Sequence, residues 1–260
     1  MTEAEFQIVK SIGFVLALAS AVAVQRLRPH RSMAGSWRPN SRLWVLDAVV
    51  LGAVCAGCAC TVSRWASGAG VGLLNQGAVS AWVAISMSVL GMDFVSYVWH
   101  RANHVVPLLW RFHQAHHSDL DYTVTTALRF HPVELLLALP LRLVAIAVFG
   151  VPIAGVVVFE VIFAFANFFE HGNIDLPLKL ERALGRLLIT PALHRRHHSR
   201  EARLLDTNYG TIFSFWDRLF GSYGEHRSDV RVSTGLPGID RPLWVREILW
   251  LPVRGVFRGA

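Results

Sequence analysis

Histidines in three closely spaced groups are the residues best able to do chemistry in this sequence of 260 residues. A pair comes first, and two triplets of identical HxxHH spacing follow: His100 and His104; His113, His116 and His117; His194, His197 and His198. Residues three and four apart share one face of a helix, so each group can point its imidazoles in one direction. Neutral imidazole is the commonest metal ligand among side chains. Because these groups hold more imidazoles than one ion can bind, the spacing predicts a site for two metal ions.

Two further histidines are candidate ligands. His171 follows an apolar stretch in the segment Asn167-Phe-Phe-Glu-His-Gly-Asn173, where a returning helix would bring it back to the site. His131, in Arg129-Phe-His-Pro132, is the weaker candidate. Five carboxyl and amide residues are candidate hydrogen-bond partners that would orient the imidazoles: Glu134, Glu170, Asn173, Asp206 and Asn208. Helix capping or loop hydrogen bonds explain these five equally well. No catalytic residue is predicted beyond the metal site.

The donor set narrows the choice of metal. Imidazole ligands suit iron, zinc, copper or nickel. A structural zinc site is closed by four ligands, which would leave half of these histidines unused. Two ions with open positions indicate cooperative chemistry, and iron is the metal that activates dioxygen. The donor set therefore leaves iron, zinc, copper and nickel open and favours iron, which zinc can replace in purified protein.

The composition indicates a membrane protein. Hydrophobic residues make up 53% of the chain and charged residues 17%, with a mean hydropathy of +0.41. These values are too apolar for an ordinary soluble domain and favour several transmembrane helices. The net charge of +7 is not evidence for nucleic-acid binding, because no basic motif stands apart from the apolar runs. Excess arginine in a membrane protein usually lies in cytoplasmic loops that face anionic lipid.

Three apolar runs are long enough to cross a bilayer as helices, at residues 6–24, 43–62 and 78–99. The first run could instead be a cleaved signal peptide, because the segment Leu18-Ala-Ser-Ala-Val-Ala23 offers small residues suited to cleavage, but its leading flank is acidic. A fourth apolar stretch, 133–169, predicts a helical hairpin. Three turn-forming residues interrupt it: Pro140, Gly150 and Pro152. Three charged residues make it less purely apolar, so that one limb is expected to be buried in protein or interfacial: Glu134, Arg142 and Glu160.

The arginine distribution predicts which side the site faces. The loop between the first two runs carries five arginines and no acid: Arg26, Arg28, Arg31, Arg38 and Arg42. By the positive-inside rule this loop is cytoplasmic. Residues 100–131 and 171–260 then lie on the same side, which brings all the clustered histidines together in the cytoplasm. The expected location is an inner or plasma membrane.

The predicted fold is all-α: a polytopic membrane bundle of about three full spans plus a helical hairpin, with a cytoplasmic histidine-lined dimetal domain. Residues 1–77 form the N-terminal spans, 78–225 the catalytic segment, and 226–260 a C-terminal tail. In the tail, 241–251 predicts an amphipathic helix at the membrane surface, because two tryptophans accompany arginine there. The CxxC spacing of Cys55 and Cys58 lies in an apolar run, so membrane packing explains it better than zinc or redox chemistry.

Longer motifs connect the histidines to a known family. They are Trp110-Arg-Phe-His-Gln-Ala-His-His-Ser118, Asp121-Tyr-Thr-Val-Thr-Thr-Ala-Leu-Arg-Phe-His-Pro132 and Asn208-Tyr-Gly-Thr-Ile-Phe-Ser-Phe-Trp-Asp-Arg-Leu-Phe-Gly221. Over roughly residues 80–225 the chain resembles the fatty acid hydroxylase/sterol desaturase superfamily of integral-membrane di-iron oxygenases. Within it, the sequence looks most like the bacterial sterol desaturase-like and alkylglycerol monooxygenase group.

The resemblance implies ferrous iron, dioxygen and electrons from a separate ferredoxin, cytochrome or reductase. It implies hydroxylation or desaturation of a lipid C–H bond, and leaves open which reaction occurs and whether the lipid is a sterol, fatty acyl chain, ether lipid or carotenoid. Nine histidines match the family's ligand motifs: His100, His104, His113, His116, His117, His171, His194, His197 and His198. His131 matches a family position whose role as a ligand is less firm.

Three other kinds of protein could carry clustered histidines in a membrane chain. A metal transporter would hold its ligands near the membrane midplane, whereas these histidines follow the ends of the spans. A haem-binding cytochrome needs paired axial histidines rather than triplets. A non-catalytic metal-binding relative is compatible with the motifs, although complete histidine clusters favour an enzyme.

Overall fold

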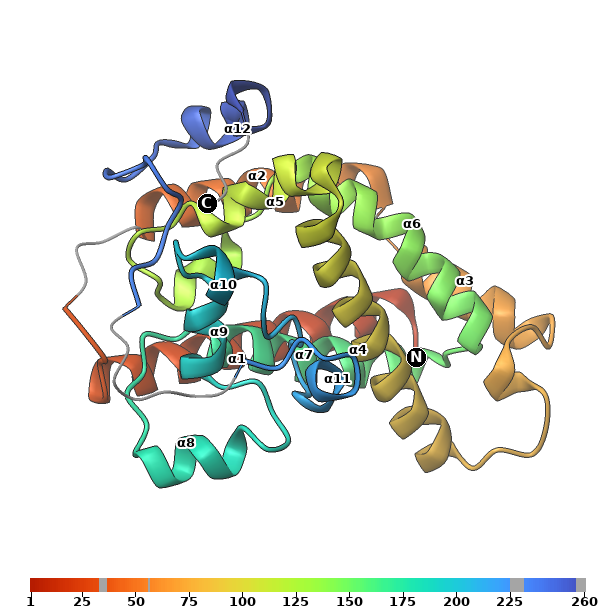
Figure 1. Ribbon diagram of the computed structural model, residues 1–260. Helices are drawn as coiled ribbons and strands as arrows, with labels where there is room; N and C mark the ends of the chain where they lie inside the picture. The colour runs from red at the N-terminus through yellow and green to blue at the C-terminus, as the bar shows by residue number, and fades with distance from the viewer. Residues whose placement is uncertain (33–36, 56, 225–231, 256–260) are drawn as a thin grey trace.

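The structure, a computed structural model, describes residues 1–32, 37–55, 57–224 and 232–255 (Figure 1). Over these residues the chain is helical, with isolated bridges but no strand. Five segments are long and apolar enough to cross a membrane: Glu3–Leu27, Trp37–Asn75, Ala81–Val105, Pro132–Phe149 and Ile153–Glu170. The prediction of an all-α membrane bundle is confirmed, and these segments indicate an integral membrane protein.

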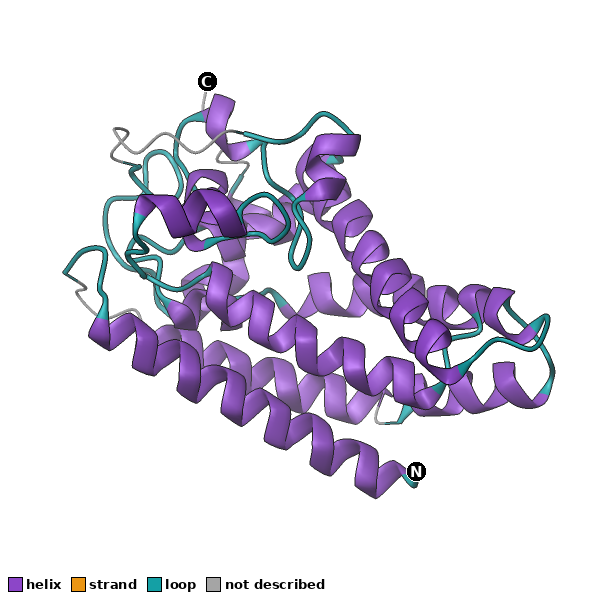
Figure 2. Cartoon of the chain, turned by 90° about the horizontal axis from the view of Figure 1, so that it is seen from below, coloured by secondary structure: helices purple, strands orange, loops and turns teal. Residues whose placement is uncertain are grey.

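The long helices are α1 (Glu3–Leu27), α2 (Trp37–Cys55), α4 (Ala81–Val105), α6 (Pro132–Phe149) and α7 (Ile153–Glu170). α1 packs along α7, and α4 packs against both α6 and α7. The shorter helices are α3 (Cys58–Gly68), η1 (Leu73–Asn75), α5 (Pro107–His117), η2 (Val124–Leu128), α8 (Leu178–Leu184), α9 (Pro191–His197), α10 (Ala202–Leu205), α11 (Phe215–Leu219) and α12 (Val245–Arg254). Figure 1 and Figure 2 show most of the shorter helices and loops at the end of the long helices opposite the amino terminus, whereas α3 and the loop after it lie at the amino-terminal end.

The second predicted span, 43–62, is divided in the structure. α2 ends at Cys55 and α3 begins at Cys58, after Gly57 with a φ of 78°. A side chain at Gly57 would be strained by this left-handed conformation and would collide with Oε1 of Glu3. The division therefore depends on the left-handed conformation of a glycine, which hydropathy does not report.

The predicted hairpin is α6 and α7. α6 ends at Gly150, which has a φ of 67°, and Pro152 precedes α7, as the turn residues predicted. Pro140 was also expected to interrupt the apolar stretch, and that expectation is wrong, because α6 continues through it. Proline removes only one helical hydrogen bond, and neighbouring helices can satisfy the carbonyl that it frees.

The C-terminal helix α12 packs on α5 and α2. Ile248 and Leu251 are buried in a cluster with Leu43 and Trp110. The apolar face of α12, which was predicted to lie on the membrane surface, is therefore partly buried against α5 and α2. Two tryptophans remain exposed, Trp244 and Trp250. Their position at a membrane surface stays a prediction.

Candidate metal centre

Four elements bring the predicted ligands together. α4 carries His100 and His104, because it continues six residues beyond the predicted end at Trp99, to Val105. Val106 then separates α4 from α5, whose first residue is Pro107, a residue that favours the first position of a helix. α5 carries the first triplet, His171 caps α7, and α9 with its capping residue carries the second triplet. Apart from His100, which lines a cavity, all of these histidines are buried.

The nine histidines form two groups, and within each group the candidate ligand atoms lie within 4.8 Å of one another. The five-histidine group is His100, His104, His113, His117 and His197, and the four-histidine group is His116, His171, His194 and His198. Neighbouring residues divide between the groups, since successive side chains on a helix point about 100° apart. Each group can hold a metal ion.

Hydrogen bonds at Nδ1 leave Nε2 available as the ligand atom of several imidazoles. Five Nδ1 atoms lie at hydrogen-bond distance from an oxygen: His100 from Tyr209 O (2.8 Å), His113 from Glu134 Oε1 (2.8 Å), His116 from Arg129 O (3.1 Å), His171 from Asn167 O (2.7 Å) and His197 from Thr207 O (2.7 Å). These oxygens fix each ring with Nδ1 as the donor, so the Nε2 lone pair faces the group's centre.

The donor atoms fit metal ions. Nε2 of His171 lies 3.0 Å from Nε2 of His116 and 3.0 Å from Nε2 of His194. Nitrogen ligands about 2.0–2.1 Å from one ion, at right angles to each other, would be about 3.0 Å apart. Several other buried imidazole nitrogens have no hydrogen-bond partner among the described residues, including Nε2 of His113 and both nitrogens of His117 and His198. Buried polar atoms seldom lack a partner, and a metal ion would supply one.

Burial keeps these imidazoles neutral, which is the form that binds metal. Desolvation lowers the pKa of His171 to about 4 and that of His197 to about 3, from an ordinary value of 6.5. The pKa values of His116, His117, His194 and His198 are lowered by the same cause, reinforced by neighbouring imidazoles. The centre is therefore ready to bind cations at neutral pH.

We expect the metal-free protein to lose stability as the pH falls from 6.5 to about 4. In this window the imidazoles of the unfolded chain bind protons, whereas the buried imidazoles of the folded protein stay neutral. Each such imidazole therefore lowers the free energy of unfolding by about 1.4 kcal/mol for each pH unit that the pH falls. Thermal unfolding of chelator-treated protein in detergent, measured across the window, checks this. An unfolding midpoint that does not change with pH would contradict the burial of neutral imidazoles.

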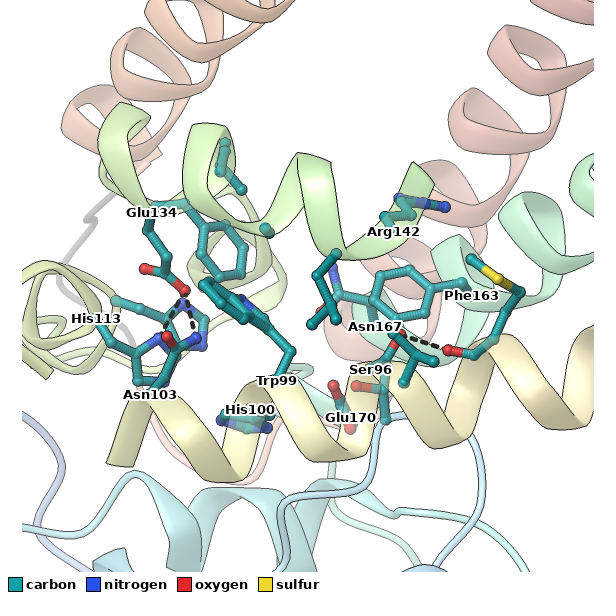
Figure 3. A pocket seen from close by; sticks show the side chains of 18 of the residues that line it. Ser96, Trp99, His100, Asn103, His113, Glu134, Arg142, Phe163, Asn167 and Glu170 are labelled. Atoms are coloured by element: carbon teal, nitrogen blue, oxygen red, sulfur yellow. Dashed lines mark hydrogen bonds and ion pairs between the residues drawn. The ribbon is translucent and has the colours of Figure 1, made fainter. Parts of the chain in front are cut away.

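Three of the predicted orienting residues lie beside imidazoles. Oε1 of Glu134 lies 2.8 Å from Nδ1 of His113 and accepts from Asn103 Nδ2 at 3.2 Å (Figure 3). Asp206 lies 3.4 Å from Nδ1 of His104. The carboxylate of Glu170 lies 3.7 Å from the Nδ1 atoms of both His171 and His194. The two 3.7 Å distances from Glu170 are too long for direct hydrogen bonds.

The other two predicted orienting residues hold loops instead. Nδ2 of Asn173 donates to Arg31 O at 2.7 Å. Nδ2 of Asn208 donates to Leu193 O at 3.2 Å, and Asn208 adopts a φ of 56°, which asparagine tolerates better than most residues.

His131 lies outside both groups. It is the N-cap of α6, where its Nδ1 accepts from Val133 N at 3.1 Å. Its Nε2 lies 3.3 Å from Leu249 O on α12. The ring therefore has a partner at each nitrogen, and its place next to Pro132 fits a helix start.

Replacing Glu134 by glutamine should weaken metal binding by the five-histidine group about 10–100-fold, because His113 would lose the charged acceptor that orients it. Metal titration of the purified protein measures this affinity. Glu201→Gln is the matched control, since Glu201 is exposed and bonds Arg203. Equal affinities for the two variants would show that the Glu134 carboxylate does not tune the centre.

Two aspartates outside the predicted site hold the loop after α10. Asp217 accepts from Tyr209 N at 2.7 Å and Gly210 N at 2.9 Å, which places the Tyr209 carbonyl against His100. Asp93, a charge within a predicted span, accepts from Ile212 N at 3.1 Å and from Trp216 Nε1 at 2.9 Å, which anchors the same loop and α11 to α4. A charged residue within a span, such as Asp93, can be recognised in the sequence as a candidate structural or functional residue. The role of a backbone carbonyl such as that of Tyr209 cannot.

A cavity of about 210 Å³ leads to the histidines between α4, α6 and α7 (Figure 3). Its walls are largely apolar and include Trp99, Phe130, Leu135 and Phe163. Histidines from both groups line it: His100, His113, His116, His171 and His194. The cavity can therefore bring an apolar chain to the metal centre.

Known proteins resemble the chain over this region. Human (Homo sapiens) alkylglycerol monooxygenase is 34% identical over 149 residues, which cover 55% of this chain and 31% of that protein. An ornithine lipid hydroxylase of Rhizobium tropici is 31% identical over 163 residues, or 60% of this chain and 47% of that protein. A cholesterol 25-hydroxylase-like protein of Danio rerio is 30% identical over 142 residues, or 53% and 54%. The match thus spans between about a third and about half of each relative's length.

No solved structure matches the chain. The family model described as fatty acid hydroxylase matches residues 85–222, which is more than half of the chain and includes all nine grouped histidines. The resemblance seen in the histidine motifs is confirmed by this match. The chain belongs to the fatty acid hydroxylase family.

Proposed function

We propose that the chain is a membrane-bound oxygenase that hydroxylates or desaturates a lipid C–H bond with dioxygen and external electrons. One observation carries the proposal: two adjacent groups of buried histidines line the end of an apolar cavity between helices long enough to span a membrane. The relatives' names, which include a monooxygenase and lipid hydroxylases, support the same reaction class.

The proposed ligands are the nine grouped histidines, without His131, because His131 caps α6. When bound, two iron ions supply the reactivity toward dioxygen and the C–H bond. Zinc in place of iron is expected in some purified preparations. The apolar cavity walls bind the lipid chain and exclude water, while Glu134 and the Nδ1 acceptors hold the imidazoles in place.

The electrons are proposed to come from a separate protein, a ferredoxin, cytochrome or reductase. We also propose that the centre faces the cytoplasm from an inner or plasma membrane. The arginines of 26–42 support this side, because α1 reaches the histidine end of the molecule, where Gln25 accepts from Val124 N and Asn173 N. The division into 1–77, 78–225 and 226–260 is part of the same proposal.

Oxygen consumption tests the function. Iron-loaded protein in lipid nanodiscs, given a chemical reductant and a membrane lipid extract, should consume dioxygen and yield lipids that have gained an oxygen atom or a double bond. Zinc-loaded protein is the control, because zinc has no redox chemistry. Equal oxygen consumption with both metals, or no modified lipid, would favour a non-catalytic metal-binding protein. Metal efflux from vesicles in place of oxidation would favour a transporter.

A further inference from the structure

The apolar cavity has a charged end away from the histidines. Arg142 on α6 lines the cavity and forms an ion pair with Glu160 on α7. Both residues lie inside helices long enough to cross a membrane. Charged side chains inside spans are costly, face the bundle interior and often mark the path of a substrate. This pair therefore calls for a ligand or structural reason of its own.

The two polar ends of the cavity are separated by about two turns of α6. Glu134, beside His113, and Arg142 lie on the same helix (Figure 3). The difference between positions 134 and 142 corresponds to about 12 Å along α6. Between them, Leu135, Ala138 and Leu141 line the cavity. An extended alkyl chain that advances about 1.25 Å per carbon would cover this distance with about ten carbons.

The charged end has unused hydrogen-bonding capacity. One terminal nitrogen of Arg142 bonds Oε1 of Glu160, and the guanidinium carbon lies 5.4 Å from the centre of the Phe159 ring. The buried Nε has no hydrogen-bond partner among the residues that the structure describes. A third of the Arg142 side chain is exposed, so part of the guanidinium can reach a ligand. A hydrocarbon end placed there would leave these donors unpaired, which is unfavourable.

The net charge of the Arg142–Glu160 pair determines which polar group of a ligand can bind there. Arg142 is already neutralised by Glu160, so an anionic ligand would leave an excess negative charge in a largely apolar site. A cationic ligand would leave an excess positive charge. An alcohol hydroxyl adds no charge and accepts a hydrogen bond from the guanidinium, which lines the cavity and stays neutralised by Glu160 behind it.

We propose that Arg142, neutralised by its ion pair with Glu160, binds the hydroxyl group of an uncharged lipid alcohol, whose chain extends about ten carbons to the histidines. The inference rests on the proposed function for the statement that this lipid is the substrate. It makes the pair a specificity determinant: the distance between the pair and the metal centre selects which carbon is oxidised.

Photoreactive probes test the proposal by binding alone. Each probe is an alkyl chain of about ten carbons with a diazirine at one end. The other end is a hydroxyl, carboxylate, trimethylammonium or methyl group. Metal-loaded protein in nanodiscs is illuminated with each probe, and mass spectrometry locates the labelled residues. The hydroxyl probe should label 99–103 and 130–135, beside the histidines, about tenfold more than any other probe, since a hydrogen bond to a charged group is worth about that factor.

The double variant Arg142→Met/Glu160→Leu removes both charges without leaving either one buried alone, so it is expected to fold. It should label equally with the hydroxyl and methyl probes. Arg203→Met/Glu201→Leu removes an exposed ion pair and should behave as the wild type. Equal labelling by hydroxyl and methyl probes in the wild type would overturn the proposal, as would a hydroxyl preference that persists in the first double variant.

Glu160→Gln gives a second, independent test. Without the carboxylate, Arg142 lacks its counter-charge, so labelling by the carboxylate probe should rise about tenfold. No rise would overturn the role given to the pair. Oxygen consumption is recorded on the same preparations. Absent oxygen consumption with a preserved hydroxyl preference would contradict only the proposed oxygenase, whereas normal oxygen consumption without the preference would contradict only the hydroxyl site.

Discussion

Replacing His116 by alanine should lower the iron content of the protein from two ions per chain to one and abolish lipid oxidation. His116 belongs to the four-histidine group, where its Nε2 lies 3.0 Å from Nε2 of His171. Loss of a residue that only orients a ligand costs about 10–100-fold in metal affinity or activity. Loss of the ligand itself should therefore cost more than about a hundredfold. Elemental analysis and the lipid assay measure the two effects.

The adjacent residue gives a matched comparison. His117 belongs to the five-histidine group, so His117→Ala should affect that group's ion and leave the other in place. Iron spectra of the two variants should therefore differ, since different ions remain. His131→Ala should retain both ions, because His131 lies outside both groups. A His116→Ala protein with unchanged iron content and turnover would rule out the proposed centre.

Most of the fold was predictable because hydropathy reports helices directly. The apolar runs and the turn at Gly150 located the membrane bundle, and the HxxHH spacing located the histidines. The division of α2 from α3 was not predictable, since it depends on the left-handed conformation of Gly57 inside an apolar run. Hydropathy reports that a run can be helical, but not where its backbone turns.

Which histidine belongs to which group could not be predicted from the sequence either. Spacing places His116 and His117 on neighbouring helix faces. It does not say that His197 joins His117 while His198 joins His116, because that depends on how α9 packs against α5. The acceptors for Nδ1 are mostly backbone carbonyls, such as Tyr209 O and Thr207 O, which any residue type provides. These contacts follow from tertiary structure alone.

The second large effect is expected at Arg129, a fully buried arginine that connects three parts of the centre. Its guanidinium donates to Ala115 O and Ser118 Oγ at the end of α5, and to Asn40 Oδ1 on α2. Its own carbonyl lies 3.1 Å from Nδ1 of His116. The side chain thus fixes the end of the helix that carries the first triplet, and no smaller cation can make all of these bonds at once.

Arg129→Met should therefore destabilise the protein by about 3–5 kcal/mol, the usual cost of removing one member of a buried charged network. The buried carboxylate of Asp119 would also lose a nearby positive charge. Thermal unfolding in detergent should show a midpoint lower by on the order of 10 °C. Arg129→Lys should be nearly as damaging, because an ammonium group cannot reproduce the guanidinium fork. Arg182→Met, at an exposed position of α8, is the control. If Arg129→Met unfolds within about 2 °C of the wild type, the α5 end is held by other contacts, and the orientation of His116 does not depend on this arginine.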